Sequence, residues 1–448
     1  MTADEKMLEM LDDLIERAKK AGADAADAVA IESAELSHAQ RLGEIEKLER
    51  SESRDLGLRV LIGTRQAIAS SSDQNEDALA DLVKRAVAMA KAVPEDQFCG
   101  LAEPADVLGG EAADLGIFDP GEPTPEVLIE RAKAAEEAAL AVEGVTNSEG
   151  SEASWGRTRI ALAASNGFTG GYAGSRHGVA ASVLAGEGTG MERDYDWASA
   201  VFGEDLDDPA EIGRSAGERA VRRLNPKKMD SGKVPVIYDP RVSGGLVRHF
   251  AGAINGSAIA RGTSFLKDSM DKKVFADGIH IVDDPHRERG LRSKPFDAEG
   301  LANDAMNLIE DGVLQTWILD LRSARQLGLA STGRASRGVS GPPSPATTNL
   351  YMAPGKVSPA ELMADIEQGF YITELMGFGI NSVTGDYSRG AAGFWIDGGE
   401  IAHPVSEMTV AGNLEDMFLA MTPADDLTFR FGTDAPTIRV EGMTVAGG

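Results

Sequence analysis

A linker-like segment near the middle of the chain constrains the fold more than any other feature of the sequence. The stretch NPKKMDSGK, from Asn225 to Lys233, is polar and contains a proline and a glycine. The chain has 448 residues, which is too long for one typical hydrophobic core. We therefore predict an N-terminal domain over residues 1–228 and a C-terminal domain over residues 229–448.

The first half alternates between helical and strand-like patterns, which predicts an α+β domain of mixed helices and sheet. Apolar residues at helical spacing predict a first helix that ends near Gly22. The strand-like runs DLGLRVLIG and RQAIASSS, joined by Gly63-Thr64, predict a hairpin. A second helix is expected to open with the capping pair Asp73 and Glu76. Later signals are helix starts at Thr124-Pro125 and Asp208-Pro209 and a turn at Asn166-Gly167.

The second half is predicted to be mostly antiparallel β structure. A strand over 234–238 is followed by a helix near 241–256. Asp311-Gly312 is a hairpin signal, and the capping box at Ser358–Glu361 predicts another helix start. About the last 80 residues are predicted to form mostly short strands joined by turns.

The charge balance argues against nucleic acid as a partner. The chain has 72 Asp and Glu against 44 Lys and Arg, a net charge of −28, which repels phosphate backbones and anionic membranes. A single cysteine, Cys99, excludes an internal disulfide and a CxxC metal site. The N-terminus lacks a signal-peptide pattern and no apolar run has membrane-spanning length, so we expect a cytoplasmic protein.

Two segments are candidates for a metal site. In LVRHFAGAING, His249 follows a strand as the first histidine of a zinc helix would, but position i+4 is Ala253, so no second ligand stands there. The segment HIVDDPH groups four residues that can bind metals, and it also fits a strand end that enters a solvated loop. These four are His280, Asp283, Asp284 and His286.

Three patterns resemble nucleophile motifs. GRSAG matches G-x-S-x-G, but Ser215 falls inside a predicted helix, whereas a nucleophile elbow needs a strand before the serine. SFLK places Ser264 and Lys267 at the S-x-x-K spacing, without the companion S-D-N motif. Cys99 has no nearby histidine or basic residue in the sequence, so an inert thiol is expected.

One long segment resembles a known family. Thr373–Met417, which reads TELMGFGINSVTGDYSRGAAGFWIDGGEIAHPVSEMTVAGNLEDM, is similar to the signature region of the TldD/PmbA peptidase family, in its PmbA branch, also called TldE. PFDAEG from Pro295, SARQLG from Ser323 and STG from Ser331 fit the same pattern. The resemblance covers nearly the whole chain and implies the two-domain α+β architecture of that family.

The resemblance also accounts for the isolated histidine. In the TldD branch the corresponding helix carries H-E-x-x-x-H, and a cysteine near the C-terminus completes the zinc site. Here His249 holds the first histidine position, Phe250 replaces the glutamate and Ile254 replaces the second histidine. The segment Leu427–Pro436 contains no cysteine. A lone imidazole does not hold and activate a zinc-bound water, so we expect a degenerate metal helix with no metal, cofactor or catalytic residue in this chain.

The family implies a cytosolic zinc peptidase of two related subunits that cleaves unstructured peptides in a cavity and acts in peptide maturation. We expect this chain to be the non-catalytic subunit, which forms cavity walls and activates a zinc-bearing TldD-like partner by assembly. Such peptides are expected to bind by adding a strand to a sheet edge. One alternative is a homodimer that binds peptides or a protein without protease activity. Another is an independent hydrolase that uses Ser264 and Lys267.

The stretch TGDYSRG supplies candidate cavity-lining residues. It is rich in glycine and hydrogen-bonding groups, which suits the wall of a cavity near the partner's metal. A polar hairpin held by an Asp386–Arg389 pair explains the same composition equally well. The residues concerned are Thr384, Gly385, Asp386, Tyr387, Ser388 and Arg389.

Overall fold

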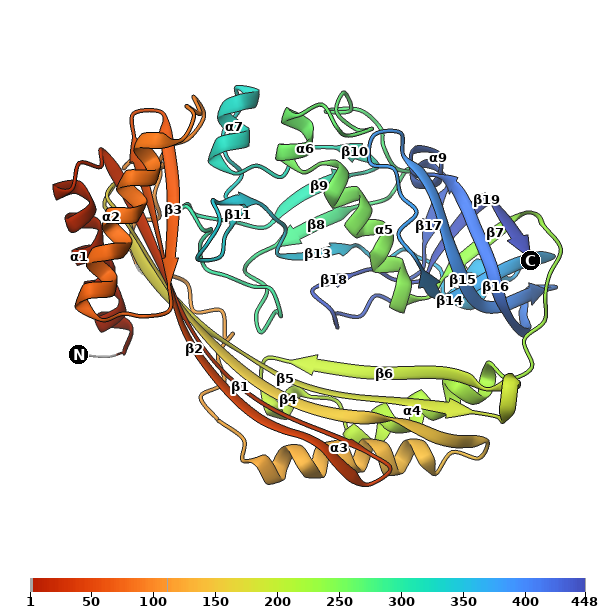
Figure 1. Cartoon of the computed structure of the whole chain (residues 1–448). Helices are drawn as coiled ribbons and strands as arrows, with labels where there is room; N and C mark the ends of the chain where they lie inside the picture. The colour runs from red at the N-terminus through yellow and green to blue at the C-terminus, as the bar shows by residue number, and fades with distance from the viewer. Residues whose placement is uncertain (1–2, 111, 448) are drawn as a thin grey trace.

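One six-stranded sheet organises the first half of the protein, in the strand order β3-β2-β1-β4-β5-β6. The structure is a computed structural model that describes residues 3–110 and 112–447. Every pairing in this sheet is antiparallel, and its long strands curve beneath the rest of the molecule (Figure 1). The strands are β1 (Ala25–Arg41), β2 (Glu44–Ile62), β3 (Arg65–Ser71), β4 (Val145–Ala164), β5 (Thr169–Ala185) and β6 (Glu192–Ala200).

Two pairs of helices cover the two ends of this sheet. α1 and α2 pack on the end that carries β3, and α3 and α4 pack on the other end (Figure 1). The predicted helices and the hairpin are confirmed, but one predicted cap is wrong. Asn75, held by Asp73, caps α2, and its side-chain oxygen accepts from the Ala78 N–H at 2.9 Å. The helices are α1 (Ala3–Lys20), α2 (Glu76–Ala92), α3 (Pro125–Leu140) and α4 (Pro209–Arg222).

Glycines in α4 set its close contact with α3. A Cβ at Gly213 would lie 1.8 Å from the carbonyl oxygen of Ala135, and Gly217 is similarly crowded by α3. Any larger residue at Gly213 would therefore collide with the neighbouring backbone. Ser215 lies inside α4, as predicted, and donates its hydroxyl hydrogen to Asp196 at 2.6 Å. The GRSAG pattern is thus explained by helix packing.

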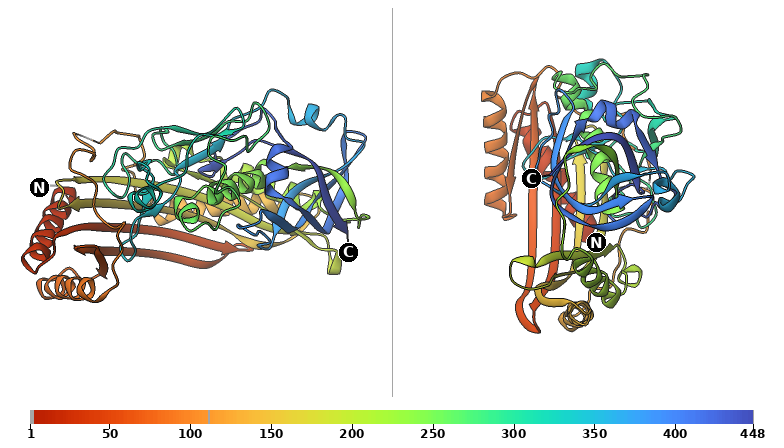
Figure 2. Two further views of the ribbon diagram at one scale, coloured as in Figure 1. Left: turned by 90° about the horizontal axis from the view of Figure 1, so that it is seen from above. Right: turned by 90° about the vertical axis from the view of Figure 1, so that its right-hand side faces the viewer.

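The second half forms two larger sheets that are mostly antiparallel, as predicted. Their strand orders are β16-β15-β14-β7-β19-β17 and β10-β9-β8-β13-β18, with parallel pairs only at β7–β14 and β13–β18 among the described strands. The end-on view of Figure 2 shows the C-terminal strands wrapped around helix α5 (Pro240–Ala253). The strands of the first of these sheets are β7 (Gly232–Tyr238), β14 (Gln368–Met376), β15 (Asp386–Asp397), β16 (Glu400–Asn413), β17 (Met421–Pro423) and β19 (Ile438–Gly447).

The remaining elements are short. The strands of the second sheet are β8 (Ile281–Asp284), β9 (Met306–Glu310), β10 (Val313–Leu314), β13 (Asn349–Met352) and β18 (Thr433–Asp434), and β11 (Ala335–Ser336) pairs with β12 (Ser344–Pro345). The helices are α6 (Gly256–Ala260), α7 (Leu321–Leu327), α8 (Pro359–Met363) and α9 (Leu414–Leu419), and the 3-10 turns are η1 (Gly188–Gly190) and η2 (Gly203–Asp205). The hairpin at Asp311-Gly312 and the capping box at Ser358 and Glu361 are confirmed. The prediction of mostly short C-terminal strands is wrong for β15 and β16, which have 12 and 14 residues.

Buried ion pairs join the two halves. The Asp27 carboxylate on β1 contacts Arg59 on β2 and also Arg337, which belongs to the second half. Arg241 at the start of α5 contacts Asp194 on β6 at 2.8 Å. The first sheet ends at β6 and the next begins with β7, so the predicted boundary between residues 228 and 229 falls between α4 and β7. Among the described helices, none combines the length and apolarity needed to cross a membrane.

Candidate functional site

Helix α5 carries the positions that the sequence compares with a zinc helix. Asp239 caps it, accepting from the Arg241 N–H at 2.9 Å, and Pro240 occupies the first turn. Gly244 lets the helix approach β18, since a Cβ there would lie 2.7 Å from the Thr433 carbonyl oxygen. The helix ends at Ala253, before Ile254, so the predicted range near 241–256 contains both α5 and the start of α6.

The two positions where the zinc branch has a glutamate and a second histidine are filled by the apolar core. Phe250 and Ile254 each have 0% of their surface exposed. The Phe250 ring packs edge-to-face on Phe275, with ring centroids 5.1 Å apart, and on Phe418 at 6.2 Å. These contacts are the ordinary packing of aromatic side chains, which leaves no room for a water-bearing metal.

His249 is half-buried beside positive charge. Its ring centroid lies 6.1 Å from that of Tyr387. Burial and the guanidinium groups of Arg389 and Arg248 lower the pKa of His249 to about 4. Throughout residues 3–110 and 112–447, no three His, Cys, Asp or Glu side chains lie together as a metal-binding group. The residues around His249 therefore do not suit a divalent cation, which needs anionic or neutral donors.

The lowered pKa of His249 predicts how stability depends on pH. Between pH 6.5 and about 4 the unfolded chain binds a proton at this position and the folded protein does not. The free energy of unfolding is therefore expected to fall as the pH drops through this window. In the variant His249→Gln this loss should be smaller, which denaturant unfolding at a series of pH values would measure. An identical loss in both proteins would contradict the assignment.

The TGDYSRG segment divides between two faces of a strand. Because β15 begins at Asp386, residues 386 and 388 lie on one face and residues 387 and 389 on the other. Asp386 and Ser388 are exposed, and the Asp386 carboxylate accepts from the Thr384 hydroxyl at 2.6 Å. Tyr387 is buried beside His249, and Gly385 is a buried turn residue with φ +78°.

The suggested Asp386–Arg389 pair is therefore wrong, since the two side chains leave the strand on opposite sides. The positive charge of Arg389 instead helps to lower the pKa of His249. Whether the exposed residues of this segment face a cavity in an assembly stays a prediction.

The other candidate residues have structural partners. Asp283 is buried, contacts Arg334 and accepts from the Thr348 N–H at 2.6 Å. The His286 ring contacts the Asn303 side chain at 2.9 Å, and its backbone N–H donates to the Asp284 carboxylate at 3.0 Å. Ser264 is buried and donates its hydroxyl hydrogen to the Ala253 carbonyl oxygen, while Lys267 is exposed. This arrangement does not favour a Ser/Lys hydrolase.

Cys99 is a partly buried thiol. Burial and the nearby Asp96 carboxylate raise its pKa. A raised pKa leaves the thiol protonated at neutral pH, where it is a weak nucleophile. The inert role expected from the sequence agrees with this environment.

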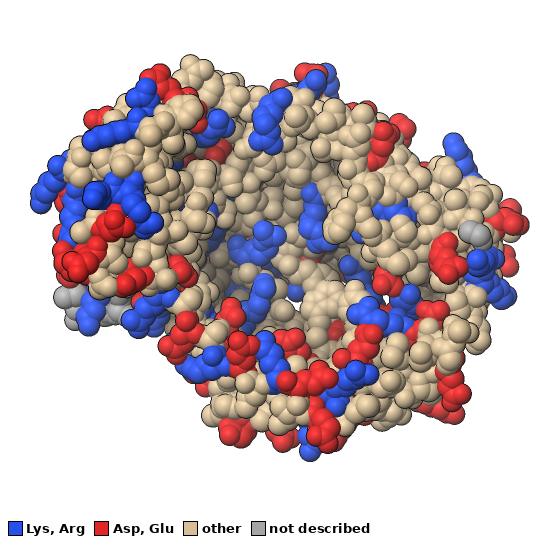
Figure 3. Space-filling model, viewed as in Figure 1, with Lys and Arg blue, Asp and Glu red and all other residues tan. Residues whose placement is uncertain are grey.

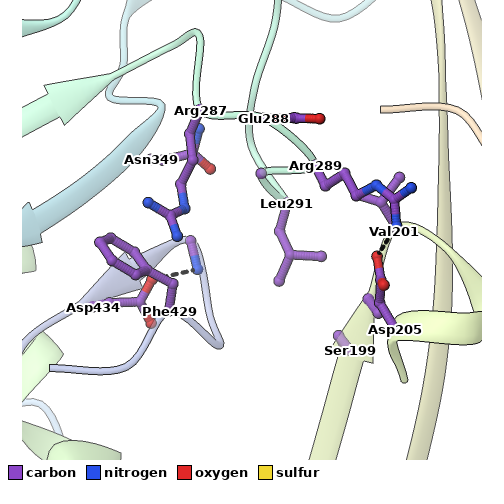
Figure 4. Close-up of a pocket in the computed structure, with 13 residues that line it drawn as sticks. Ser199, Val201, Asp205, Arg287, Glu288, Arg289, Leu291, Asn349, Phe429 and Asp434 are labelled. Atoms are coloured by element: carbon purple, nitrogen blue, oxygen red, sulfur yellow. Dashed lines mark hydrogen bonds and ion pairs between the residues drawn. The ribbon is translucent and has the colours of Figure 1, made fainter. Parts of the chain in front are cut away.

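A hollow lies between the curved sheet and the C-terminal domain (Figure 3). Three adjoining cavities of about 240, 600 and 240 Å³ share Leu291 in their walls. In the first cavity, Leu291 lies between Arg287 over Phe429 on one side and the Arg289–Asp205 pair on the other (Figure 4). Lys and Arg side chains gather in the hollow, whereas Asp and Glu mark its outer rim (Figure 3).

The basic lining of the hollow was not predicted from the sequence. Its arginines come from positions as distant as Arg176 on β5 and Arg430 before β18. These arginines belong to no local sequence motif. The fold brings their segments together. The sequence signals only that acidic residues, 72 in number, exceed basic ones. A cluster of positive charges in such a chain therefore indicates a site that attracts anions.

Comparison with known protein families covers most of the chain. Residues 26–90 match the PmbA/TldA metallopeptidase domain 1, residues 118–224 match the central domain and residues 231–447 match the C-terminal domain. The chain has the domain content of a PmbA/TldD-type metallopeptidase protein. It belongs to the PmbA/TldD family, as the sequence resemblance indicated.

Relatives of known name and structure support this assignment. The chain is 37% identical over 426 residues to Metalloprotease PmbA of Escherichia coli O157:H7, covering 95% of this chain and 92% of that protein. A crystal structure of a candidate modulator of DNA gyrase from Bacteroides thetaiotaomicron has a TM-score of 0.91 at 29% identity and covers both chains fully (100% each). TldE from Thermococcus kodakarensis has a TM-score of 0.86 at 20% identity, over 98% of this chain and 100% of that one, and shares the fold.

Proposed function

We propose that this chain is the non-catalytic subunit of a cytosolic two-subunit zinc peptidase. In this proposal it pairs with a TldD-like subunit that bears H-E-x-x-x-H, forms part of the wall of the cavity in which unstructured peptides are cleaved, and activates its partner by assembly. The zinc ion, which supplies the activated water, belongs to the partner. The PmbA name of its relatives and the TldE name of a structural neighbour support the pairing with a TldD-like subunit.

The observation that carries this proposal is the environment of α5. Phe250 and Ile254 are buried in the hydrophobic core, and the charges of Arg248 and Arg389 act with burial to lower the pKa of His249. A metal-activated water needs several donors around one open position, and here the donors are replaced by phenyl, alkyl and guanidinium groups. The hollow, with its three adjoining cavities, supports a role in holding an extended chain.

A mixing experiment tests the proposal. Hydrolysis of an unstructured peptide is measured with this chain alone, with the H-E-x-x-x-H relative from the same organism alone, and with both together. We expect cleavage in the mixture only, and its loss when a zinc chelator is added. Cleavage by this chain alone would contradict the proposal, and peptide binding without cleavage in the mixture would favour the alternative of a homodimeric peptide-binding protein.

A further inference from the structure

A positively charged pocket lies in the hollow where β6, α5 and the segment before β18 meet. It is a cavity of about 240 Å³, and we call it the arginine pocket. Its positive charge is unexpected in a chain whose net charge is −28. The residues that define it are Arg176, Arg241, Arg248 and Arg430, together with Trp197 and Phe431.

Two of these arginines are free to bind a ligand. Arg241 contacts Asp194 at 2.8 Å and Arg430 contacts Asp207 at 3.2 Å, so their charges are largely compensated. The side chains of Arg176 and Arg248 make no ion pair or hydrogen bond with any described residue, and both are accessible to solvent inside the hollow. A guanidinium group carries five N–H donors, so two unpartnered groups in one pocket leave a strong, unused capacity to bind an anion.

The surrounding charges increase this capacity. Burial and the neighbouring Arg292 lower the pKa of both Arg176 and Arg248. The charge of Arg389 lowers the pKa of Arg248 further. The Asp434 carboxylate opposes this effect and raises the pKa of Arg248. It already accepts hydrogen bonds from three backbone N–H groups at 2.8–3.1 Å. An anion that enters the pocket would therefore relieve repulsion between cations as well as form charge-assisted hydrogen bonds.

The pocket opens into a longer space, which favours an extended ligand over a small ion. It shares Ser199 and Leu291 with the adjoining cavity of about 240 Å³. It shares Arg176 and Leu291 with the cavity of about 600 Å³. An anionic group that binds in the arginine pocket can therefore be part of a chain that continues along the hollow.

The edge of β6 indicates which part of a peptide reaches the pocket. Among the described strands, β6 pairs only with β5. In an antiparallel strand the N–H and C=O of one residue point to the same side, and this side alternates from one residue to the next. The backbone N–H and C=O groups of Tyr195 and Trp197 point away from β5. Side chains, and not the neighbouring strand, form hydrogen bonds with them. The N–H groups are bound by Asp194 and Asp196, and the C=O groups by Arg241 and Arg430.

By this alternation the backbone of Ser199 also points outward, into the hollow. Arg430 closes the edge at Trp197, and the Val201 carbonyl oxygen accepts from the Ser175 hydroxyl at 3.0 Å, so Ser199 is the open position of this edge before β6 ends at Ala200. A peptide that adds antiparallel to β6 at Ser199 must run toward Trp197. Its C-terminal end therefore arrives at the arginine pocket.

We propose that the arginine pocket binds a carboxylate of an extended peptide, with Arg176 and Arg248 as its partners. Asp and Glu side chains offer the same chemistry as the C-terminal carboxylate, and the β6 edge favours the C-terminal one. This inference rests on the proposed function, since it assumes that the hollow takes up peptides. It adds a preference of this subunit for free carboxyl termini or acidic segments.

Fluorescence anisotropy with the purified full-length chain tests the proposal. The probe is a short labelled peptide of Gly, Ser and Ala, prepared with a free C-terminal carboxylate or with a C-terminal amide. Two further amidated peptides contain one internal Glu or one internal Gln and separate the two sources of carboxylate. We expect the free acid to bind roughly tenfold more tightly than the amide, as for a charge-assisted contact.

Matched variants locate the effect. Arg248→Gln and Arg176→Gln should each remove most of the difference between acid and amide, and Arg54→Gln should leave it unchanged because that side chain is 70% exposed on β2. Since the guanidinium groups of Arg176 and Arg248 have no ion-pair or hydrogen-bond partner among the described residues, both variants should fold, which a thermal unfolding midpoint near that of the parent would verify. Tight binding of the amidated Glu peptide, but not of the Gln peptide, would support the proposal with a side-chain carboxylate.

Several results would overturn the proposal. Equal affinity for acid, amide, Glu and Gln peptides would do so, as would a difference that survives both arginine variants. Inorganic phosphate that binds more tightly than the peptide, and is lost in the same variants, would assign the pocket to another ligand. Cleavage in the mixing experiment without carboxylate-dependent binding would remove this inference alone, whereas carboxylate-dependent binding without cleavage would remove the proposed function alone.

Discussion

Replacing Asp27 by Ala is expected to lower the free energy of unfolding by about 3–5 kcal/mol. The Asp27 side chain is 3% exposed and its two oxygens contact Arg59 and Arg337, which are 4% and 1% exposed. Both arginines raise the acidity of Asp27, so that its pKa lies below the ordinary value despite the opposing effect of burial. Removing the carboxylate leaves two buried guanidinium groups without their ion-pair partner. Because Arg337 belongs to the second half, the contact between the halves should weaken as well.

Chemical denaturation of Asp27→Ala, compared with Asp13→Ala, measures this effect. Asp13 is 53% exposed and pairs with Arg17 on the surface, where an ion pair contributes at most about 1 kcal/mol. A triple variant, Asp27→Leu with Arg59→Met and Arg337→Met, should recover much of the loss, because it removes the buried charges together. If Asp27→Ala were no less stable than Asp13→Ala, the buried triad would not hold the halves together.

Restoring the zinc motif in α5 is expected to cost stability without creating a metal site. The double variant Phe250→Glu with Ile254→His places a carboxylate where Phe250 packs on Phe275 and Phe418. Loss of the buried ring alone costs about 3–5 kcal/mol, and an unpaired buried carboxylate adds to this. Arg248 and Arg389 remain beside His249, and their charges oppose the binding of a dication.

Zinc content and thermal unfolding of the purified variant provide the measurement. We expect less than stoichiometric zinc and a lowered unfolding midpoint. The single variant Ile254→His keeps Phe250 in place and still offers two imidazoles, so it tests metal binding if the double variant does not fold. Phe250→Leu is the packing control and should cost less, since it remains apolar. Stoichiometric zinc in either folded variant would show that α5 has kept a metal site.

Local signals in the sequence predicted local structure well. The caps at Asp208 and Ser358 and the turns at Gly63-Thr64 and Asp311-Gly312 all lie where the sequence places them. The predicted cap at Asp73 is wrong by two positions, because Asn75 binds the helix N–H of Ala78 while Asp73 binds the N–H of Asn75. Such signals are reliable because the chemistry of a cap or a turn depends on residues within about one helical turn of each other.

The exposed half of β2 shows what local signals miss. Residues 44–54 are exposed along both faces of the strand, and β3 pairs only with residues 56–62. Their charged sequence lacks the alternation that predicts a half-buried strand. They are extended because they pair with β1, and that contact lies outside the segment itself.

The sequence by itself determined the family, the α+β class and the loss of the metal-binding residues, because each of these depends on which residues stand at which positions. Only the tertiary structure decided where charge collects. Arg176, Arg248 and Arg292 are far apart along the chain, yet the charge of Arg292 lowers the pKa of the other two in the hollow. Asp386 and Arg389 are close in sequence but lie on opposite faces of β15. Electrostatic interactions depend on distance through space, and the fold sets that distance independently of separation along the chain.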